Sequence, residues 1–277
     1  MTILHACHPD DVRQYDTERL RTQFLVETLL EPYRFHFAYA HYDRFLVGGA
    51  VPIDAPLTLP AYPEVLKADF FLERRELGLI NVGGAGVVVA DGEQFALDKL
   101  DGLYLGKGTR EVALISRDAD NPARFFMASA PAHHPYPNRR LTRQEAAPVE
   151  TGSAEAANQR TIYKYIHAEG LASCQLIMGL TVLQPGSVWN TMPPHVHDRR
   201  MEAYFYFDLP ENQRVFHLMG QPDQTRHVVV ANEQAVFSPP WSIHSGCGTT
   251  SYSFVWAMAG ENHTYTDMDA VPVQALR

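Results

Sequence analysis

Two histidines one residue apart, followed by a glutamate, are the residues of this chain best suited to metal chemistry. In the stretch PPHVHDRRME, one residue separates His195 from His197, and Glu202 comes five positions after His197. Side chains i and i+2 of a strand share a face, so both imidazoles point the same way if the segment is extended. His244, in SPPWSIHSG, follows a later β-rich region and a Pro-Pro turn, and a neighbouring strand could deliver it to the same point. Three imidazoles and a carboxylate suit zinc, or else iron, manganese or cobalt.

Two alternatives to a catalytic metal stay open. A His-x-His pair alone indicates little in a chain with 13 histidines, and it could be a strand with two solvated imidazoles. The glutamate and the later histidine favour a metal site over that alternative. The metal itself could be structural, because four protein ligands fill a tetrahedral zinc, whereas an octahedral ion keeps two positions for substrate oxygens.

Composition excludes several classes of protein. The 277 residues include 23 Lys and Arg against 32 Asp and Glu, and the net charge of −9 argues against nucleic acid as a partner. Cys7, Cys174 and Cys247 are too few and too scattered for a disulfide framework, which favours the cytoplasm. No signal peptide and no apolar run near the roughly 18 residues of a membrane span is evident. The glycosylation acceptor Asn262-His263-Thr264 is therefore dismissed.

The elements that must position the candidate ligands are mostly strands. One helix is expected near the N-terminus, where Asp16 or Thr17 could cap a segment whose Leu20, Phe24 and Leu29 or Leu30 fall near one face. Asp91-Gly92, between two apolar runs, predicts a tight hairpin. Many short β-rich runs with Gly and Pro turns predict an all-β sandwich or barrel with a few short helices.

Internal similarity predicts a duplicated β domain. Residues 71–84 (FLERRELGLINVGG) resemble residues 197–209 (HDRRMEAYFYFDL) with one residue inserted at Met201, an alignment that places Glu76 opposite Glu202. Downstream, LYLGKGTREV aligns with VFSPPWSIHS. Three segments follow from the comparison, namely an N-terminal domain of residues 1–130, a connection of residues 131–160 and a C-terminal domain of residues 161–277.

The two copies differ at the candidate ligands. On this alignment, His195 and His197 correspond to Phe70 and Leu72, and His244 corresponds to about Glu111. Only the C-terminal copy is expected to bind a metal.

Two motifs resemble those of the cupin family. HVHDRRME matches a first motif of His-x-His, four residues and Glu, and PPWSIH matches a second motif of Pro with His five positions later. The chain departs from the pattern at Leu209, Trp241 and Gly248, where cupins have glycine, glycine and asparagine. These departures concern turns and leave the four candidate ligands in place.

Longer stretches resemble the 5-keto-4-deoxyuronate isomerase family over nearly the whole chain. Among them are RFLVGG, FLERRELGLINVGGAG, NTMPPHVHDRRMEAYFYF, MGQPDQTRH and NEQAVFSPPWSIHSGCGT. The resemblance implies a double-cupin fold, a homohexamer and one zinc in the C-terminal half. It also implies that the zinc ligands are His195, His197, Glu202 and His244.

The implied reaction is an aldose–ketose isomerisation of the EC 5.3.1 type, suspected to be 5.3.1.17, in pectin and uronate breakdown. It converts 5-dehydro-4-deoxy-D-glucuronate, a small-molecule substrate, to 3-deoxy-D-glycero-2,5-hexodiulosonate. A base must remove the proton on carbon 2, and a divalent metal can stabilise the resulting negative charge. Candidates for the base or for a hydrogen-bond donor are Glu202, Tyr204 and Tyr206, which share a strand face.

The substrate carboxylate requires a cationic partner. Its candidates are Arg226, Arg199, Arg200 and Lys164. Because Arg74 and Arg75 occupy the positions of Arg199 and Arg200 in the metal-free copy, a structural role is an alternative for that pair. Alternatives for the function are a 5-deoxy-glucuronate isomerase of inositol breakdown, a cupin dioxygenase and a non-catalytic sugar-binding cupin.

Overall fold

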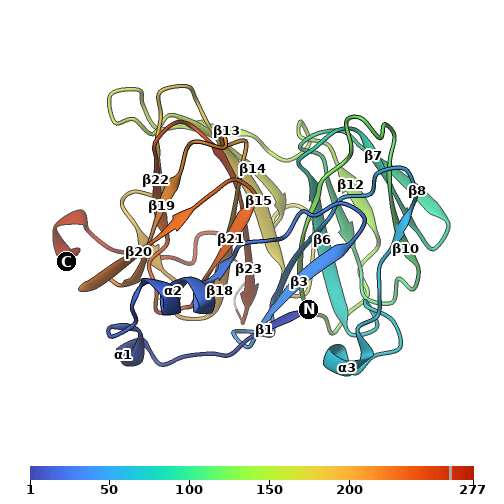
Figure 1. Ribbon diagram of the computed structural model, residues 1–277, viewed down its shortest axis with the longest axis horizontal. Coiled ribbons are helices and arrows are strands. Elements are labelled where there is room, and N and C mark those ends of the chain that lie inside the picture. The colour runs from blue at the N-terminus through green and yellow to red at the C-terminus, as the bar shows by residue number, and fades with distance from the viewer. Residues whose placement is uncertain (262–263) are drawn as a thin grey trace.

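Strands form two β-rich halves that lie side by side (Figure 1). The computed structural model describes residues 1–261 and 264–277, so Asn262 and His263 of the dismissed glycosylation acceptor lie outside the described residues. Each half contains one seven-stranded and one four-stranded sheet. The all-β architecture expected from the sequence is confirmed.

In the first half, the large sheet has the order β1-β3-β4-β11-β6-β9-β12 and the small sheet has the order β5-β10-β7-β8. The large sheet consists of β1 (Thr2–Leu4), β3 (Phe35–Ala40), β4 (Leu46–Ala50), β6 (Arg75–Asn81), β9 (Gly102–Leu105), β11 (Phe125–Pro131) and β12 (Arg139–Leu141). The small sheet consists of β5 (Leu57–Thr58), β7 (Gly86–Ala90), β8 (Glu93–Leu97) and β10 (Val112–Ser116). Asp91 and Gly92 connect β7 to β8 with φ angles of 47° and 86°, which confirms the predicted hairpin.

The second half repeats this plan, with the orders β13-β14-β15-β23-β18-β21-β2 and β16-β22-β19-β20. The large sheet consists of β2 (Leu25–Val26), β13 (Val149–Thr151), β14 (Arg160–Ile166), β15 (Ile177–Leu183), β18 (Arg200–Phe207), β21 (Gln234–Ser238) and β23 (Ser253–Gly260). The small sheet consists of β16 (Trp189–Asn190), β19 (Val215–Gln221), β20 (Gln224–Val230) and β22 (Ser245–Gly248). A further pair joins β17 (His195–Val196) to β24 (Asp269–Ala270).

The helices are short and peripheral. They are α1 (Pro9–Val12), α2 (Thr17–Phe24), α3 (Pro63–Leu66) and the 3₁₀ turn η1 (Val273–Ala275). The predicted cap of α2 is confirmed, because the Asp16 carboxylate accepts a hydrogen bond from the Arg19 backbone N–H at 2.8 Å. Among the described residues, none of the helices has the length and apolar composition that a bilayer crossing requires.

The N-terminal segment belongs partly to the second half. Leu20 and Phe24 of α2 are buried in the apolar core of that half, and the following β2 pairs with β21. Figure 1 shows α1 and α2 on the side of the second half, away from the sheets that contain β6 and β10, and α2 contacts β20 and β21. The N-terminal segment therefore forms one wall of the second half.

The duplication predicted from the sequence is present, but one detail of the alignment is wrong. β6 and β18 occupy the same place in their sheets, as do β9 and β21. Glu202 pairs with Ser238, whereas Leu77 pairs with the equivalent Leu105. Leu77 is therefore the counterpart of Glu202, and no residue is inserted at Met201. Because side chains alternate along a strand, the one-residue error places Glu76 on the opposite face from Glu202.

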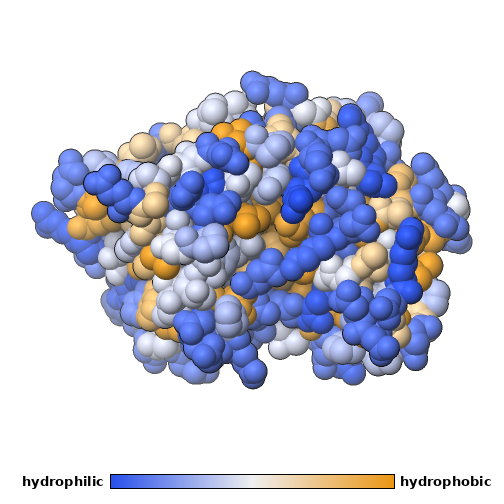
Figure 2. Space-filling view, turned by 90° about the horizontal axis from the view of Figure 1, so that it is seen from above, coloured by the Kyte–Doolittle hydropathy of each residue, from blue (hydrophilic) through white to orange (hydrophobic). Residues whose placement is uncertain are grey.

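Three apolar clusters stabilise this arrangement. One fills the space between the two sheets of the first half, and another does the same in the second half. The third lies between the two large sheets, where Phe126 and Phe205 stack with their ring centroids 4.7 Å apart. Figure 2 shows that one face of the molecule is mostly hydrophilic, with apolar side chains gathered near its centre.

Candidate metal site

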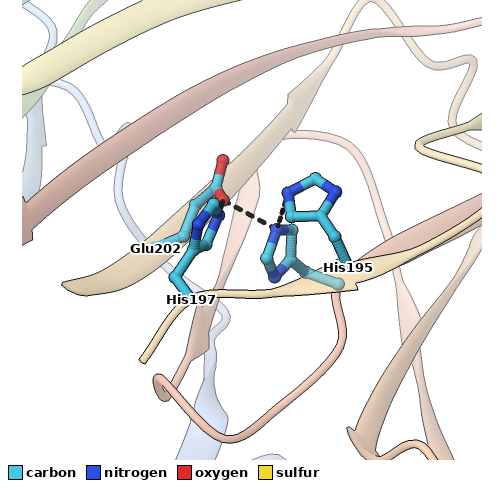
Figure 3. Close-up of side chains that lie close together, drawn as sticks. His195, His197 and Glu202 are labelled. Carbon is cyan, nitrogen blue, oxygen red and sulfur yellow. Dashed lines mark hydrogen bonds and ion pairs between the residues drawn. The ribbon is translucent and has the colours of Figure 1, made fainter. Parts of the chain in front are cut away.

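The structure brings the four candidate ligands together at one end of the second half. His195 begins β17, His197 follows that strand, Glu202 lies in β18, and His244 immediately precedes β22. One ligand atom from each residue lies within 4.8 Å of every other. Figure 3 shows the side chains of His195, His197 and Glu202 converging, and all three come from the short stretch of residues 195–202. His195 is half-buried and the other three are buried, so water has little access to them.

The distances between the ligand atoms suit a shared divalent ion. Glu202 Oε2 lies 3.1 Å from His197 Nε2 and 2.8 Å from His244 Nε2, and His244 Nε2 lies 2.9 Å from His195 Nε2. All four ligand atoms lie within 4.8 Å of one another, so a single divalent ion could be held by all of them.

The hydrogen bond made by His197 determines which of its nitrogens is available. Its Nδ1 lies 2.8 Å from the carbonyl oxygen of Asp267, which can only accept, so Nδ1 carries a hydrogen. In the neutral imidazole, Nε2 then presents a lone pair to Glu202 Oε2, another acceptor. Two facing acceptors repel unless a cation lies between them. The four residues therefore fit a divalent metal ion, and the second-nitrogen hydrogen bond is typical of metal-binding histidines.

Electrostatics at the site keep the ligands in forms that bind metal. Burial, with a contribution from His244, lowers the pKa of His195 to about 3, so its imidazole is neutral. Burial by itself raises the pKa of Glu202, but His244 and His197 outweigh that effect and hold it well below the ordinary value. The site therefore combines an ionised carboxylate at Glu202 with a neutral imidazole at His195.

Beside the quartet lies a cavity of about 270 Å³. His195, His197 and Glu202 line one part of it, and Phe254, Trp256 and Met258 of β23 supply an apolar wall. A largely apolar cavity with a few convergent polar groups is the usual form of a small-molecule site.

The two candidate tyrosines have different surroundings. Tyr204 lines the cavity, and its hydroxyl lies 2.8 Å from Thr191 Oγ1. Burial raises the pKa of Tyr204 well above its ordinary value, so its hydroxyl stays protonated at neutral pH. Tyr206 is fully buried between the sheets, and its hydroxyl lies 2.7 Å from His217 Nδ1 rather than in the cavity.

The four cations expected to bind a carboxylate are placed elsewhere. Arg226 donates hydrogen bonds to the carbonyls of Arg13 and Tyr15, and the exposed Arg199 pairs with Glu261 at 2.6 Å. Lys164 lies over the Tyr265 ring, 5.6 Å from its centroid. None of these is among the described residues that line the cavity.

Arg200 instead supports the metal site indirectly, through hydrogen bonds to a loop that contacts His197. Its guanidinium donates hydrogen bonds to the carbonyl of Thr264 at 2.6 Å and to that of Asp267 at 2.9 Å. The Asp267 carbonyl is also the acceptor for His197 Nδ1. Arg200 therefore holds the loop that orients His197.

Sequence reasoning missed Arg160, which lines the cavity together with Ile162. Both belong to β14, the strand that also contains Lys164, and alternate residues of a strand share a face. The alternation of side chains along the strand therefore predicts Arg160 and Lys164 equally well as the cation that faces the cavity. Only the three-dimensional arrangement distinguishes the two.

Comparison with known proteins identifies the family. The model of the KduI/IolB family matches residues 61–273. The chain belongs to this family. A protein named 4-deoxy-L-threo-5-hexosulose-uronate ketol-isomerase from Halalkalibacterium halodurans is 55% identical over 273 residues, which is 99% of each chain. A protein of the same name from Caldicellulosiruptor bescii is 51% identical over 277 residues and the full length of both.

Solved structures show the same architecture at low sequence identity. An IolB-like protein from Salmonella typhimurium LT2 has a TM-score of 0.74 at 18% identity, covering 90% of this chain and 96% of its own. Oxalate decarboxylase from Bacillus subtilis has a TM-score of 0.55 at 11% identity, covering 81% of this chain and 70% of its own. With the two repeated β halves, these likenesses show the double-cupin fold implied by the sequence motifs.

Proposed function

We propose that this protein is a ketol-isomerase that converts 5-dehydro-4-deoxy-D-glucuronate to 3-deoxy-D-glycero-2,5-hexodiulosonate. The observation that carries the proposal is identity of 51–55% over essentially the whole chain with proteins named for this activity. The His195, His197, Glu202 and His244 cluster beside a cavity supports it, because the reaction needs stabilised negative charge on a carbonyl oxygen.

The reaction moves a carbonyl from carbon 1 to carbon 2. A proton leaves carbon 2, a proton joins carbon 1, and a further proton passes between the two oxygens, so the atoms balance without an external oxidant. A divalent ion held by the quartet would polarise the carbonyl oxygen and stabilise its developing charge. We take this ion to be zinc, with manganese, iron or cobalt as the alternatives.

Two side chains are suited to the proton transfers. The contacts of Glu202 to His197 and His244 use Oε2, so Oε1 is the atom we assign to carry the proton from carbon 2 to carbon 1. Tyr204, kept neutral by burial, can donate a hydrogen bond to a substrate oxygen from the cavity wall. Tyr206 is assigned a packing role because His217 binds its hydroxyl.

Several broader features accompany the proposal. The proposed division is into residues 1–130, 131–160 and 161–277, although α1, α2 and β2 of the first part pack in the second half. The rest of the first part is assigned a scaffolding role, since Leu77 replaces the glutamate ligand there. We also propose a homohexamer located in the cytoplasm. A second candidate function, isomerisation of 5-deoxy-glucuronate, is favoured by the family description, which joins two subfamily names, and by the fold of the IolB-like protein.

The test is turnover of a substrate pair by the purified, metal-loaded protein. 5-Dehydro-4-deoxy-D-glucuronate and 5-deoxy-glucuronate are incubated separately in deuterated water and followed by proton NMR, with Glu202→Gln as the inactive control. We expect conversion of the first compound, with solvent deuterium entering at carbon 1 of the product to the extent that the proton held by Glu202 exchanges with solvent before it is transferred. Conversion of the second compound alone would transfer the assignment to the alternative, and conversion of neither would contradict both.

A further inference from the structure

The cavity beside the metal quartet contains a cation that has no ionic partner. Arg160, the first residue of β14, lines this cavity and is half-buried. Its Nη1 donates a hydrogen bond to the Asn158 carbonyl at 2.8 Å, which leaves Nε and Nη2 for other acceptors. Within residues 1–261 and 264–277, no carboxylate lies within 4.0 Å of its guanidinium.

The contrast with other arginines makes this position unusual. Arg199 and Arg124 pair with Glu261 and Glu233, and Arg200 is held by backbone carbonyls. Burial without a compensating anion lowers the pKa of Arg160 from its ordinary value, and the phenols of neighbouring tyrosines act in the opposite direction. An arginine whose pKa is lowered in this way still carries its positive charge at neutral pH. A half-buried charge with free donors is stabilised most by an anion that enters the cavity.

The position of Arg160 places this cation away from Glu202 and the other candidate metal ligands. Arg160 pairs with Leu183, the last residue of β15, and the adjacent Val182 pairs with Ser253 at the beginning of β23. Glu202 lies opposite Met258, near the end of β23. The strand order β14-β15-β23-β18 also separates the two residues by three strand spacings. The cavity therefore has a metal end and a guanidinium end.

We infer that Arg160 binds the carboxylate of the substrate and thereby selects open-chain acids whose carboxylate is remote from the reacting carbonyl. This inference rests on the proposed function. In 5-dehydro-4-deoxy-D-glucuronate the carboxylate is carbon 6 and the reacting carbonyl is carbon 1, five bonds or about 6 Å away in an extended chain. A carboxylate anchored by Arg160 leaves the aldehyde end free to reach the quartet.

The test uses two hydroxamates, because this group chelates divalent ions. Adipic acid monohydroxamate has a six-carbon chain that ends in a carboxylate, and hexanohydroxamic acid has the same chain with a methyl end. Calorimetry measures their dissociation constants with the metal-loaded wild type, Arg160→Met and Arg34→Met. Arg34→Met is the matched control, because Arg34 is an exposed arginine paired with Glu31 at 3.6 Å, outside the cavity.

We expect the wild type and Arg34→Met to bind the acid about 10- to 100-fold more tightly than the neutral compound. Arg160→Met should bind both equally, with unchanged affinity for the neutral compound. Arg160→Lys, which keeps the charge but loses the fork of donors, should retain a smaller preference and serves if Arg160→Met does not fold.

Three results would overturn the inference: equal binding of both compounds by the wild type, no binding of either, or a preference that survives in Arg160→Met. The outcome is separable from the proposed function. If the preference for the acid depends on Arg160 but the protein has no isomerase activity, the carboxylate site is supported and the proposed reaction is contradicted. Isomerase activity without the preference for the acid would contradict the role of Arg160 and leave the proposed reaction supported.

Discussion

Glu76 joins the two halves through a buried carboxylate, and its replacement by glutamine should destabilise the whole molecule. Its Oε1 accepts hydrogen bonds from the backbone N–H groups of Gln175 and Leu176, at 2.7 and 2.8 Å. Its Oε2 accepts from the Cys174 N–H and from the Tyr104 hydroxyl, both at 2.7 Å. The side chain is fully buried, so water cannot replace these donors.

The magnitude follows from counting acceptors. Glutamine has the shape of glutamate, but its NH2 group replaces one carboxylate oxygen. That oxygen accepts two hydrogen bonds, whereas an NH2 group cannot accept any, so both are lost. Each hydrogen bond to a charged group contributes about 1.5–3 kcal/mol, so the loss of two gives about 3–6 kcal/mol in the free energy of unfolding. Removal of a buried charge offsets part of this loss, which favours the lower end.

Urea denaturation at fixed protein and metal concentrations measures the effect, with Glu150→Gln as the control because Glu150 is exposed on β13. We expect Glu76→Gln to lower the free energy of unfolding by about 3–4 kcal/mol and the control to change it by less than about 0.5 kcal/mol. A loss below about 1 kcal/mol for Glu76→Gln would refute the role of this carboxylate as a connection between the halves.

Three further predictions concern the site and the fold. Tyr204→Phe removes the hydroxyl on the cavity wall and should lower kcat by about 100-fold with little change in Tm; an unchanged kcat would exclude Tyr204 as a hydrogen-bond donor in the reaction. Chelation should lower Tm, because four crowded ligands, three of them buried, lose their shared ion, and zinc should restore it; equal Tm values with and without metal would contradict this. Asp16→Ala removes the cap of α2 and should cost about 0.5–2 kcal/mol in urea denaturation, while the metal content stays unchanged.

Local patterns in the sequence predicted the parts of the fold that depend on local chemistry. Asp91-Gly92 specifies its hairpin because both residues tolerate positive φ angles, and Asp16 specifies a helix start because its carboxylate can accept a backbone N–H. The spacing of His195 and His197 predicted a pair of imidazoles on one side, and the structure brings both to Glu202 and His244.

Features that depend on long-range contacts were harder to predict. The Arg-Arg pairs suggested that Glu76 aligns with Glu202, but a match of residue types does not determine which face of a strand a side chain occupies. The pairing of Leu77 with Leu105 shows the face. Arg160 was overlooked because alternation along β14 offers Lys164 equally well, and only the neighbouring strands determine which side chain enters the cavity. Likewise, β2 is two residues long and has no local signal for joining the distant β21.

The most direct test of the central claim measures metal content and isomerisation together, for wild type and His244→Ala. Elemental analysis should give about one divalent ion per wild-type chain, with turnover of 5-dehydro-4-deoxy-D-glucuronate under anaerobic conditions. His244→Ala, if circular dichroism shows it folded, should lose most of the metal and at least about 100-fold in turnover. Full turnover by a metal-free wild type, or by His244→Ala, would contradict the assignment of this cluster as a catalytic metal site.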